Sequence, residues 1–250
     1  MKISALKSIA AACALVGISS AANAYVVLTI ADTQNGITLT CNSQVGGCDA
    51  RFTVINPNSI SFTGDIGDYH ISTTSGTGNT PGNPIFAQIN TSTTEVWRLR
   101  DLGAANALGG LYIDLSGWSF TAPNGPIKTL DGAASYTSFI SGAGDAVRSD
   151  FTADPNNTGA LTNLISCNLN ITASNDSCGT PSVLWNDVTD GPFPGFSLRS
   201  QQYFSLNLNS LLNTTSSLIA RNVPEPTSTA LVGIALLGMA AGFRRRSIKR

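Results

Sequence analysis

Between residues 25 and 208, short runs rich in β-branched and aromatic residues recur, and Gly, Pro, Asn and Asp separate them. Several runs alternate between apolar and polar side chains. Leu111, Ile113 and Leu115, for example, enclose Tyr112 and Asp114. Alternation with period two is typical of a strand that buries one face. The predicted strands are 25–30, 37–40, 51–55, 60–62, 94–99, 111–115, 118–120 and 196–208. They predict an all-β fold, a sandwich or jelly-roll-like single domain.

Two segments break this pattern. Residues 73–84 contain three Gly, two Pro and four Thr, and this composition predicts a long surface loop. Residues 159–165 are expected to form one or two turns of helix.

Charge is distributed unevenly along the chain. The whole sequence has 15 acidic and 14 basic side chains, but residues 25–223 have 14 acidic against 7 basic ones, a net charge near −7. Because nucleic-acid phosphates require a basic patch, this acidic body argues against a nucleic-acid partner. Its low content of helix-forming residues argues against a helical bundle.

The first 24 residues have the pattern of an export signal. Two lysines precede an apolar run from Ile9 to Ile18, and Ala22 and Ala24 occupy the positions that a signal peptidase reads. About ten apolar residues are too few to span a hydrocarbon core of roughly 30 Å. We therefore expect cleavage by signal peptidase, which makes Tyr25 the first mature residue.

The C-terminal residues have the layout of a stop-transfer element. Its parts are Val223-Pro224-Glu225-Pro226, an apolar stretch over 227–243, and the cluster Arg244, Arg245 and Arg246. Seventeen helical residues span roughly 25 Å, which just suffices for a thin bilayer. The arginine cluster is expected to stay in the cytoplasm. The prolines keep their tripeptide outside the helix, extended and accessible at the outer face of the membrane.

These three parts, in this order, resemble the PEP-CTERM sorting domain. The resemblance covers about a tenth of the chain and implies processing by an exosortase, a membrane-embedded cysteine protease-like enzyme. It also implies a surface or matrix protein of a Gram-negative bacterium that makes exopolysaccharide, anchored transiently in the inner membrane. A tail anchor that is never cut is the alternative. The expected organisation is a signal peptide at 1–24, a β-rich extracytoplasmic domain at 25–222 and a sorting signal at 223–250.

The four cysteines of the mature chain fall into two local pairs. Cys41 and Cys48 are seven residues apart, and Cys167 and Cys178 are eleven apart. An even number in an exported chain predicts disulfides, and the spacing does not suit a zinc site. Of the three possible connectivities we favour local pairing, since each pair brackets a loop rich in Gly, Asn or Ser. Each bond would stabilise the fold by ~2.5–3 kcal/mol.

The sequence contains no recognisable catalytic constellation. His70 is the single histidine, and no Gly-x-Ser-x-Gly elbow provides a nucleophile. Asp65 and Asp68 could pair as in a glycoside hydrolase, but they lie in a Gly-rich turn, where Asp is common. The other acidic candidates, considered for calcium, are Asp145, Asp150 and Asp154, which do not form a calcium-loop motif. We therefore predict no catalytic residue, no metal and no cofactor.

Three tryptophans, Trp97, Trp118 and Trp185, could stack on sugar rings. Trp97 and Trp118 fall in predicted strands, which favours packing in the core. The leading hypothesis is a non-enzymatic protein of the cell surface or extracellular matrix, associated with exopolysaccharide in a biofilm. A carbohydrate-binding adhesin is the main alternative, and a secreted glycoside hydrolase is the third.

Overall fold

The computed structural model describes residues 24–83, 85–100, 109–123, 127–154, 162–171, 174–180, 182–186 and 195–223. The predicted export signal up to residue 23 and the sorting signal from Pro224 onward lie outside the described residues. In the described ranges, no helix has the length and apolar character needed to cross a membrane.

The described ranges form fourteen strands. In chain order these are β1 (Tyr25–Asp32), β2 (Ile37–Asn42), β3 (Phe52–Asn56), β4 (Ser59–Ile66), β5 (Tyr69–Gly78), β6 (Phe86–Arg98), β7 (Gly109–Phe120), β8 (Ile127–Ile140), β9 (Ala146–Asp154), β10 (Thr162–Asn170), β11 (Asn175–Gly179), β12 (Val183–Asn186), β13 (Phe196–Leu206) and β14 (Leu211–Asn222).

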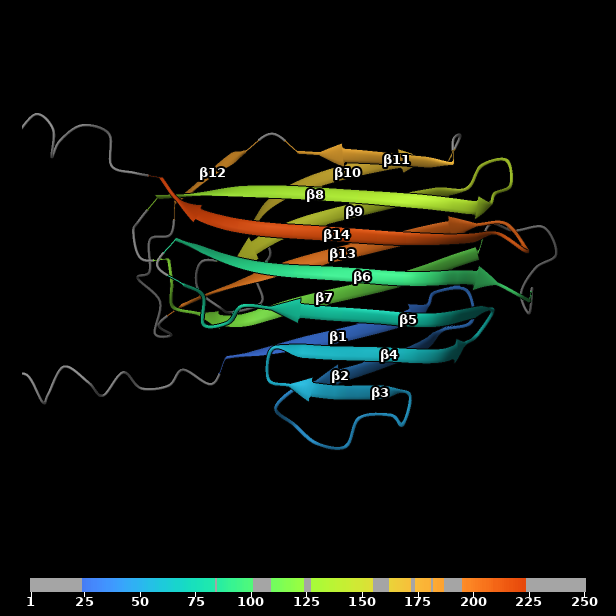
Figure 1. Cartoon of the computed structure of the whole chain (residues 1–250), viewed down its shortest axis with the longest axis horizontal. Coiled ribbons are helices and arrows are strands. Elements are labelled where there is room, and N and C mark those ends of the chain that lie inside the picture. The colour runs from blue at the N-terminus through green and yellow to red at the C-terminus, as the bar shows by residue number, and fades with distance from the viewer. Residues whose placement is uncertain are drawn as a thin grey trace, which may run out of the picture.

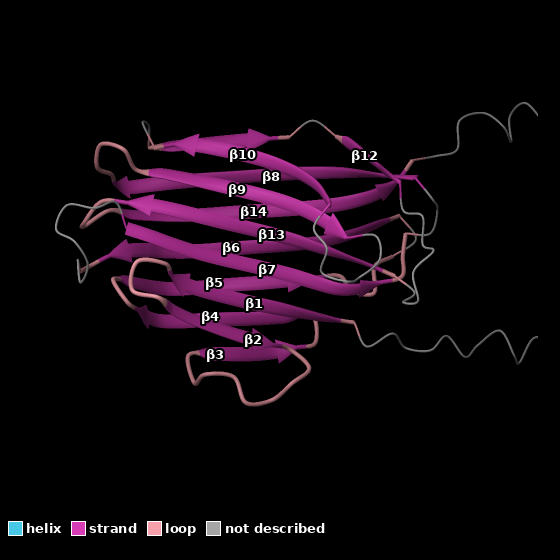
Figure 2. Cartoon of the chain, turned by 180° about the vertical axis from the view of Figure 1, so that it is seen from behind, coloured by secondary structure: helices cyan, strands magenta, loops and turns pink. Residues whose placement is uncertain are grey.

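These strands make two antiparallel sheets that pack face to face. The six-stranded sheet has the order β10-β9-β13-β7-β1-β2. The eight-stranded sheet has the order β11-β8-β14-β6-β5-β4-β3, with β12 also paired to β8. Figure 1 shows the eight-stranded sheet in front, and Figure 2 shows the six-stranded sheet from the opposite side. The all-β sandwich predicted from the alternating runs is confirmed.

Alternate side chains of each strand fill the space between the sheets. On β7, Leu111, Ile113 and Leu115 are buried in the core, as the period-two pattern predicts. The interior also contains polar groups: the Ser200 and Ser216 hydroxyls lie 2.8 Å apart between the sheets. Hydrogen bonding between such groups offsets the loss of their contacts with water.

A buried ion pair closes one end of the interior. Arg98 is 1% exposed and Asp68 is 0% exposed, and Arg98 Nη2 lies 3.5 Å from Asp68 Oδ2. Arg98 Nη1 also donates to the Leu206 carbonyl at 2.8 Å, which ties β6 to β13 of the opposite sheet. The Asp68 N–H donates to Asp32 Oδ2 at 2.8 Å. These contacts fix the β4–β5 turn against the start of the β1–β2 turn.

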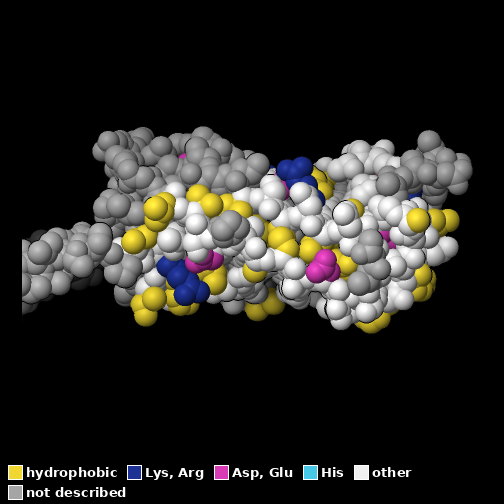
Figure 3. Space-filling view, turned by 90° about the horizontal axis from the view of Figure 1, so that it is seen from above, with side chains coloured by type: hydrophobic (Ala, Val, Ile, Leu, Met, Phe, Trp, Pro, Cys, Tyr) yellow, Lys and Arg dark blue, Asp and Glu magenta, His cyan; other side chains and the backbone are white. Residues whose placement is uncertain are grey.

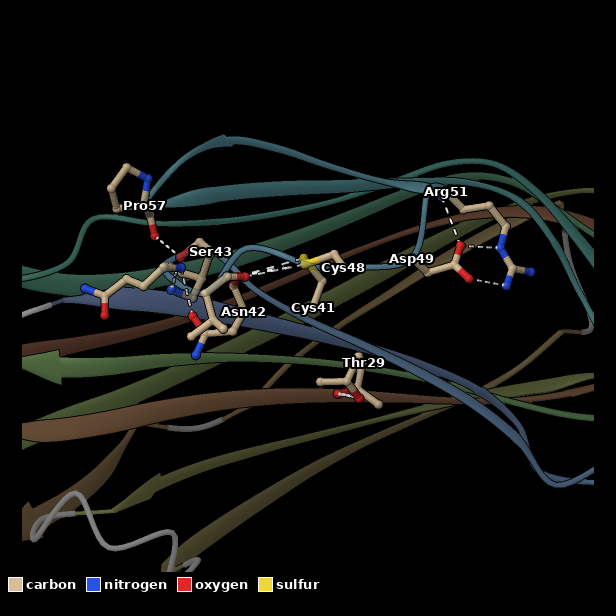
Figure 4. Close-up of a disulfide and its surroundings, with 12 residues drawn as sticks. Thr29, Cys41, Asn42, Ser43, Cys48, Asp49, Arg51 and Pro57 are labelled. Carbon is tan, nitrogen blue, oxygen red and sulfur yellow. Dashed lines mark hydrogen bonds and ion pairs between the residues drawn. A yellow bond between two sulfur atoms is a disulfide. The ribbon is translucent and has the colours of Figure 1, made fainter.

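Two disulfides join the cysteines in the local pairing that the sequence favours. Cys41 of β2 bonds to Cys48 in the following loop, with Cα atoms 5.1 Å apart (Figure 4). Cys167 of β10 bonds to Cys178 of β11, with Cα atoms 6.0 Å apart. Because β10 and β11 belong to different sheets, the second bond links the sheets at one edge of the sandwich.

The structure corrects several sequence-based boundaries. The expected loop over 73–84 was wrong for its first half, because 73–78 belong to β5, a strand inside the eight-stranded sheet. Its Gly76 fits there because a Cβ atom would lie 2.4 Å from the Leu115 side chain. Residues 162–165, expected to be helical, belong to β10, whereas 159–161 lie outside the described residues. The separate strands predicted at 111–115 and 118–120 are one strand, β7.

The first and last described strands place their outer termini at the same end of the sandwich. β1 begins and β14 ends on the left of Figure 1. Val223, the first residue of the predicted sorting segment, directly follows β14.

Candidate functional site

The outer face of the six-stranded sheet brings charged, amide and aromatic side chains of three strands together. In the view of Figure 3, charged side chains are few among the uncharged ones, and basic groups adjoin acidic ones. On the six-stranded sheet, strand alternation and register bring charged and aromatic residues into adjacent rows. Three rows run across β9, β13 and β7: Arg148–Tyr203–Tyr112, Asp150–Gln201–Asp114 and Thr152–Arg199–Ser116. A fourth row pairs Asp154 with Ser197, and Trp118 of β7 lies beside it, where the β13–β7 register shifts.

An ion pair between Arg199 of β13 and Asp114 of β7 organises the middle of this face. Arg199 Nε lies 2.9 Å from each carboxylate oxygen of Asp114. Its Nη2 donates to the Tyr112 hydroxyl at 3.0 Å, and that hydroxyl donates to Asp114 Oδ2 at 2.9 Å. With its amide oxygen facing the guanidinium, Gln201 accepts from Arg199 Nη2 at 2.9 Å. These four side chains hold one another in a fixed geometry.

The protonation of this network follows from its burial and charges. Desolvation works to lower the pKa of Arg199, but hydrogen bonds and attraction to Asp114 outweigh it, so the pKa is raised. Burial, followed by the nearby negative charge of Asp114, raises the pKa of Tyr112 above its ordinary value. Arg199 therefore stays charged and Tyr112 stays neutral near pH 7.

Aromatic pairs lie at both ends of the four rows. Tyr112 and Tyr203 have ring centroids 4.9 Å apart, and the Arg148 guanidinium lies 5.9 Å from the Tyr203 ring. At the other end, the rings of Tyr25 and Trp118 stack with centroids 6.2 Å apart. The pairs are separated by six residues of β7, roughly 20 Å at ~3.3 Å per residue.

A cleft of about 190 Å³ opens among the three rows nearest Trp118. Its lining residues are Asp114, Ser116, Trp118, Thr152, Asp154, Ser197 and Arg199. The Thr152 side chain is 2% exposed, and its hydroxyl has no hydrogen-bond partner among the described residues. A buried hydroxyl without a partner is unfavourable, and here it faces a cleft that a ligand can fill.

The outer face of the eight-stranded sheet differs in chemistry. Its shallow groove, about 430 Å³, is lined by small polar and apolar groups of β6, β8, β11 and β14. Ser135 and Thr215 share a hydrogen bond of 2.7 Å there, and Gln88 Nε2 donates to Asn90 Oδ1 at 2.8 Å. Among the described residues that line this groove, none is Asp, Glu, Lys, Arg or aromatic.

The tryptophans do not pack as the sequence suggested. Trp97 and Trp118 lie in strands, but neither belongs to the core. Trp97 is 38% exposed on the outer face of the eight-stranded sheet, and Trp118 lines the cleft of the six-stranded sheet. A strand residue can point either into the core or outward, and here both indole rings lie on outer faces of their sheets. Trp185 lies in β12.

Asp65 and Asp68 are not brought together as a carboxylate pair. Asp68 is buried beside Arg98, whereas Asp65 is on the surface, 2.6 Å from His70 Nδ1 and 3.0 Å from Arg100 Nη2. His70 lies in β5. Both carboxylates are thus engaged by neighbouring cations or the imidazole.

The aspartates considered for calcium are divided between two places. Asp145 binds the Gly142 and Asn207 N–H groups, each at 2.6 Å, in the turn before β9. Asp150 and Asp154 lie on the outer face of β9. Within the described ranges, no group of three or more His, Cys, Asp or Glu side chains is arranged to hold a metal ion.

Most predicted sorting residues lie outside the described structure. Ala22 and Ala24 both precede the expected cleavage site, and of the two only Ala24 is described. Pro224, Glu225, Pro226 and the three arginines are also outside it. Residues 222–246 match the family model of the PEP-CTERM protein-sorting motif. The chain carries a PEP-CTERM sorting motif. The recognition of these residues from the sequence is confirmed.

Comparisons of the whole chain give little more. No curated protein sequence matches it. One similar solved structure is TmCBM61 in complex with β-1,4-galactotriose, at 7% identity and TM-score 0.30, covering 60% of this chain and 88% of that one. Another is the family 11 carbohydrate-binding module from Clostridium thermocellum in complex with a β-1,3-1,4-mixed-linked tetrasaccharide. It has 10% identity and TM-score 0.24, covering 80% of this chain and 98% of that one. At these TM-scores neither similarity indicates what this chain binds.

Sequence reasoning missed the Arg199–Asp114 network altogether. A signal was present: polar or aromatic residues occupy every second position of β7 from Tyr112 to Trp118 and of β13 from Ser197 to Tyr203. The pairing of β13 with β7, across a sequence separation of 85 residues for Arg199 and Asp114, could not be read from either run alone.

Proposed function

We propose that this protein is an exported, non-enzymatic surface or matrix protein whose β-sandwich binds carbohydrate on the outer face of its six-stranded sheet. The observation that carries the proposal is the cleft beside Trp118, where the fixed Arg199–Asp114 pair and the unpartnered Thr152 hydroxyl meet. Such a cleft combines an aromatic surface with several polar groups whose positions are fixed before a ligand arrives.

Sugar chemistry suits this arrangement. A pyranose ring has C–H groups on its faces, which pack on an indole, and hydroxyls at its edge, which both donate and accept hydrogen bonds. Trp118 supplies the aromatic surface, and the hydroxyls of Ser116, Thr152 and Ser197 supply groups that donate and accept. Because Arg199 and Asp114 already bind each other, little reorganisation is needed on binding.

Binding fits this cleft better than hydrolysis. A glycoside hydrolase needs one carboxylic acid to donate a proton and a second carboxylate to act as nucleophile or base. Both oxygens of Asp114 accept from the Arg199 guanidinium, which favours a charged, structurally committed carboxylate. This supports the non-enzymatic proposal over the hydrolase alternative.

Export and sorting complete the proposal. Signal peptidase would cleave after Ala24, and an exosortase would process the chain near Pro226 while the segment 227–243 spans the inner membrane. The domain from 25 to 222 would then reach the cell surface or the matrix. The sorting-motif match at 222–246 supports this route, and association with exopolysaccharide in a biofilm belongs to the same proposal.

Carbohydrate binding is tested by substituting one exposed tryptophan on each sheet. The full-length chain, purified in detergent, is titrated calorimetrically with a panel of oligosaccharides. Trp118→Ala should lower affinity by about tenfold or more, as expected for loss of a stacked aromatic contact. Trp97→Ala is the matched control, since it removes the same side chain from the opposite sheet, and should bind normally. Binding that survives Trp118→Ala, or no binding to any glycan, would refute the proposed site.

Sorting is tested independently. Replacing Pro224-Glu225-Pro226 by three alanines should leave full-length protein, with its tail, in the inner membrane. If this variant still loses its tail and reaches the matrix at the normal rate, the tripeptide is not the recognition element and the exosortase proposal fails.

A further inference from the structure

The arginines on the outer face of the six-stranded sheet are already paired with carboxylates. Among the described residues that line the cleft, Arg199 is the one Lys or Arg, and its Nε and Nη2 bind Asp114 and Tyr112. The next cation on this face, Arg148, is paired with Asp150: Nε donates to Oδ1 at 2.9 Å, and Nη2 lies 2.7 Å from Oδ2. Both guanidinium groups are therefore engaged before any ligand binds.

Carboxylates outnumber the cations on the described part of this face. Asp114, Asp150 and Asp154 are each less than a tenth exposed, and they accompany only the two arginines in the four rows. A uronate, sulfate or phosphate group in the cleft would come close to Asp114 and Asp154. Like charges placed together at a desolvated interface are strongly unfavourable.

The remaining polar groups suit an uncharged ligand. Ser116 accepts from Trp118 Nε1 at 3.2 Å and keeps its own proton for donation. The Thr152 hydroxyl has no partner among the described residues, and a hydroxyl can both donate a hydrogen bond to a ligand and accept one from it. Sugar hydroxyls have the same dual character, so they can satisfy these groups without bringing charge into the cleft.

The spacing of the aromatic pairs indicates a long ligand. The Tyr25–Trp118 pair borders the cleft, whereas the Tyr112–Tyr203 pair lies three rows further along β7, roughly 20 Å away at ~3.3 Å per residue. Tyr203 is 39% exposed and so can be reached from solvent. A single sugar contacts one pair, and only an extended chain contacts both.

We infer that this face binds a neutral polysaccharide in extended form along β7, from the Trp118 cleft to Tyr203, and excludes polymers that carry carboxylate or sulfate groups. The inference rests on the proposed carbohydrate binding and adds the charge class and length of the ligand. The recognition groups are the hydroxyls of Thr152, Ser116 and Ser197 together with the two aromatic pairs.

The charge class is tested with two probe sets on the full-length chain: neutral oligosaccharides of glucose, galactose or mannose, and oligogalacturonates of matched length. We expect at least one neutral series to bind and the galacturonates to bind at least about tenfold more weakly. Affinity for the neutral series should stay constant up to about 0.5 M NaCl, because no ion pair forms. Tighter binding of galacturonates that weakens with salt would overturn the inference while leaving carbohydrate binding intact. No binding to either series would refute both.

The role of Thr152 is tested by Thr152→Val, which removes the hydroxyl and keeps the shape. Affinity for the neutral ligand should fall by about tenfold, with no loss of thermal stability, because the hydroxyl has no partner among the described residues to lose. Ser149→Ala is the control: Ser149 lies on the same strand, is buried on the core side and also lacks a partner among the described residues. Unchanged affinity in Thr152→Val would show that the Thr152 hydroxyl does not contact the ligand and would contradict binding in the cleft.

The length of the ligand is tested with Tyr203→Ala. This variant should bind disaccharides as the wild type does but lose the extra affinity that longer oligosaccharides gain. Trp118→Ala should weaken both. Equal behaviour of short and long ligands in Tyr203→Ala would show that the chain does not extend along β7.

Discussion

The outer faces of the two sheets are built from the same strand alternation but differ in how their side chains engage each other. On the eight-stranded sheet, short Ser, Thr and Asn side chains form scattered contacts, such as the 2.7 Å bond between Ser135 and Thr215. On the six-stranded sheet, Arg199, Asp114 and Tyr112 bind one another around a cleft. Both faces are polar, so polarity alone does not mark a binding site. A polar face becomes a candidate site when its side chains are held in fixed positions and partly buried.

The largest expected effect comes from breaking the Arg199–Asp114 pair. Asp114→Ala leaves the Arg199 side chain, 29% exposed, without its carboxylate. We expect the free energy of unfolding to fall by about 2–4 kcal/mol, somewhat below the loss typical of fully buried pairs. Urea denaturation measures it.

The matched control lies on the other sheet. Asp131 and Arg221 are 3.7 Å apart, with side chains 33% and 56% exposed, so Asp131→Ala should lower stability by at most about 1 kcal/mol. Similar losses in the two variants would contradict the difference between the faces.

Removing the disulfide between the sheets is expected to lower stability without changing ligand affinity. Replacing Cys167 and Cys178 by Ala should lower the free energy of unfolding by ~2–3 kcal/mol, because the unfolded chain regains the freedom of an eleven-residue separation. Ligand affinity should not change, since β10 and β11 lie at the sheet edges and the cleft lies over β9, β13 and β7. Calorimetric binding and chemical denaturation of the same variant measure both quantities. A parallel loss of affinity would mean that the site depends on how the sheets are joined.

Peptide mapping without reduction checks the connectivity itself. It should yield two crosslinked pairs, Cys41–Cys48 and Cys167–Cys178. A Cys48–Cys167 crosslink would contradict both the local pairing and the structure.

A smaller effect is expected at alkaline pH. Burial and the charge of Asp114 raise the pKa of Tyr112, so the folded protein resists ionisation where an unfolded tyrosine loses its proton. The stabilisation is fully present below a pH of about 10, the ordinary tyrosine pKa, and is lost as the pH rises further. Thermal unfolding between about pH 9 and 11 should show a steeper decline for the wild type than for Tyr112→Phe. Identical slopes would argue against a neutral, buried Tyr112.

The smallest effect is expected on the eight-stranded face. Ser135→Ala and Thr215→Val together should change the free energy of unfolding by less than about 0.5 kcal/mol, because the hydroxyls are exposed and water replaces their mutual bond. Binding of the neutral oligosaccharide should be unaffected. Loss of binding in this double variant would place the binding site on the eight-stranded sheet and contradict the proposed site.

Local patterns predicted much of the fold. Alternation at Leu111, Ile113 and Leu115 identified part of β7, and the β-rich composition identified the sandwich. The residues 73–78 were missed because their Thr, Ser and Gly content resembles a loop, although a Gly facing Leu115 allows close packing within β5. The order of residues 222–246 identified the sorting motif, since that signal is contained in one contiguous segment.

The candidate site was beyond the reach of the sequence because it depends on register between distant strands. Alternation placed Tyr112 and Asp114 on the face opposite the core, but nothing local indicated that Arg199 would pair with them. Membership of a predicted strand also does not decide whether a tryptophan faces the core or the solvent. Trp97 and Trp118 were therefore wrongly expected in the core.

By itself, then, the sequence determined the class of fold, the segments expected to direct export and sorting, and the cysteines that pair, because each is encoded over short separations. Only the tertiary structure decided which polar side chains meet. Antiparallel pairing of β9, β13 and β7 places Thr152, Arg199 and Asp114 around one cleft. A shift of a single residue in either pairing would turn these side chains to the other face, so the packing of the core beneath them fixes the site above.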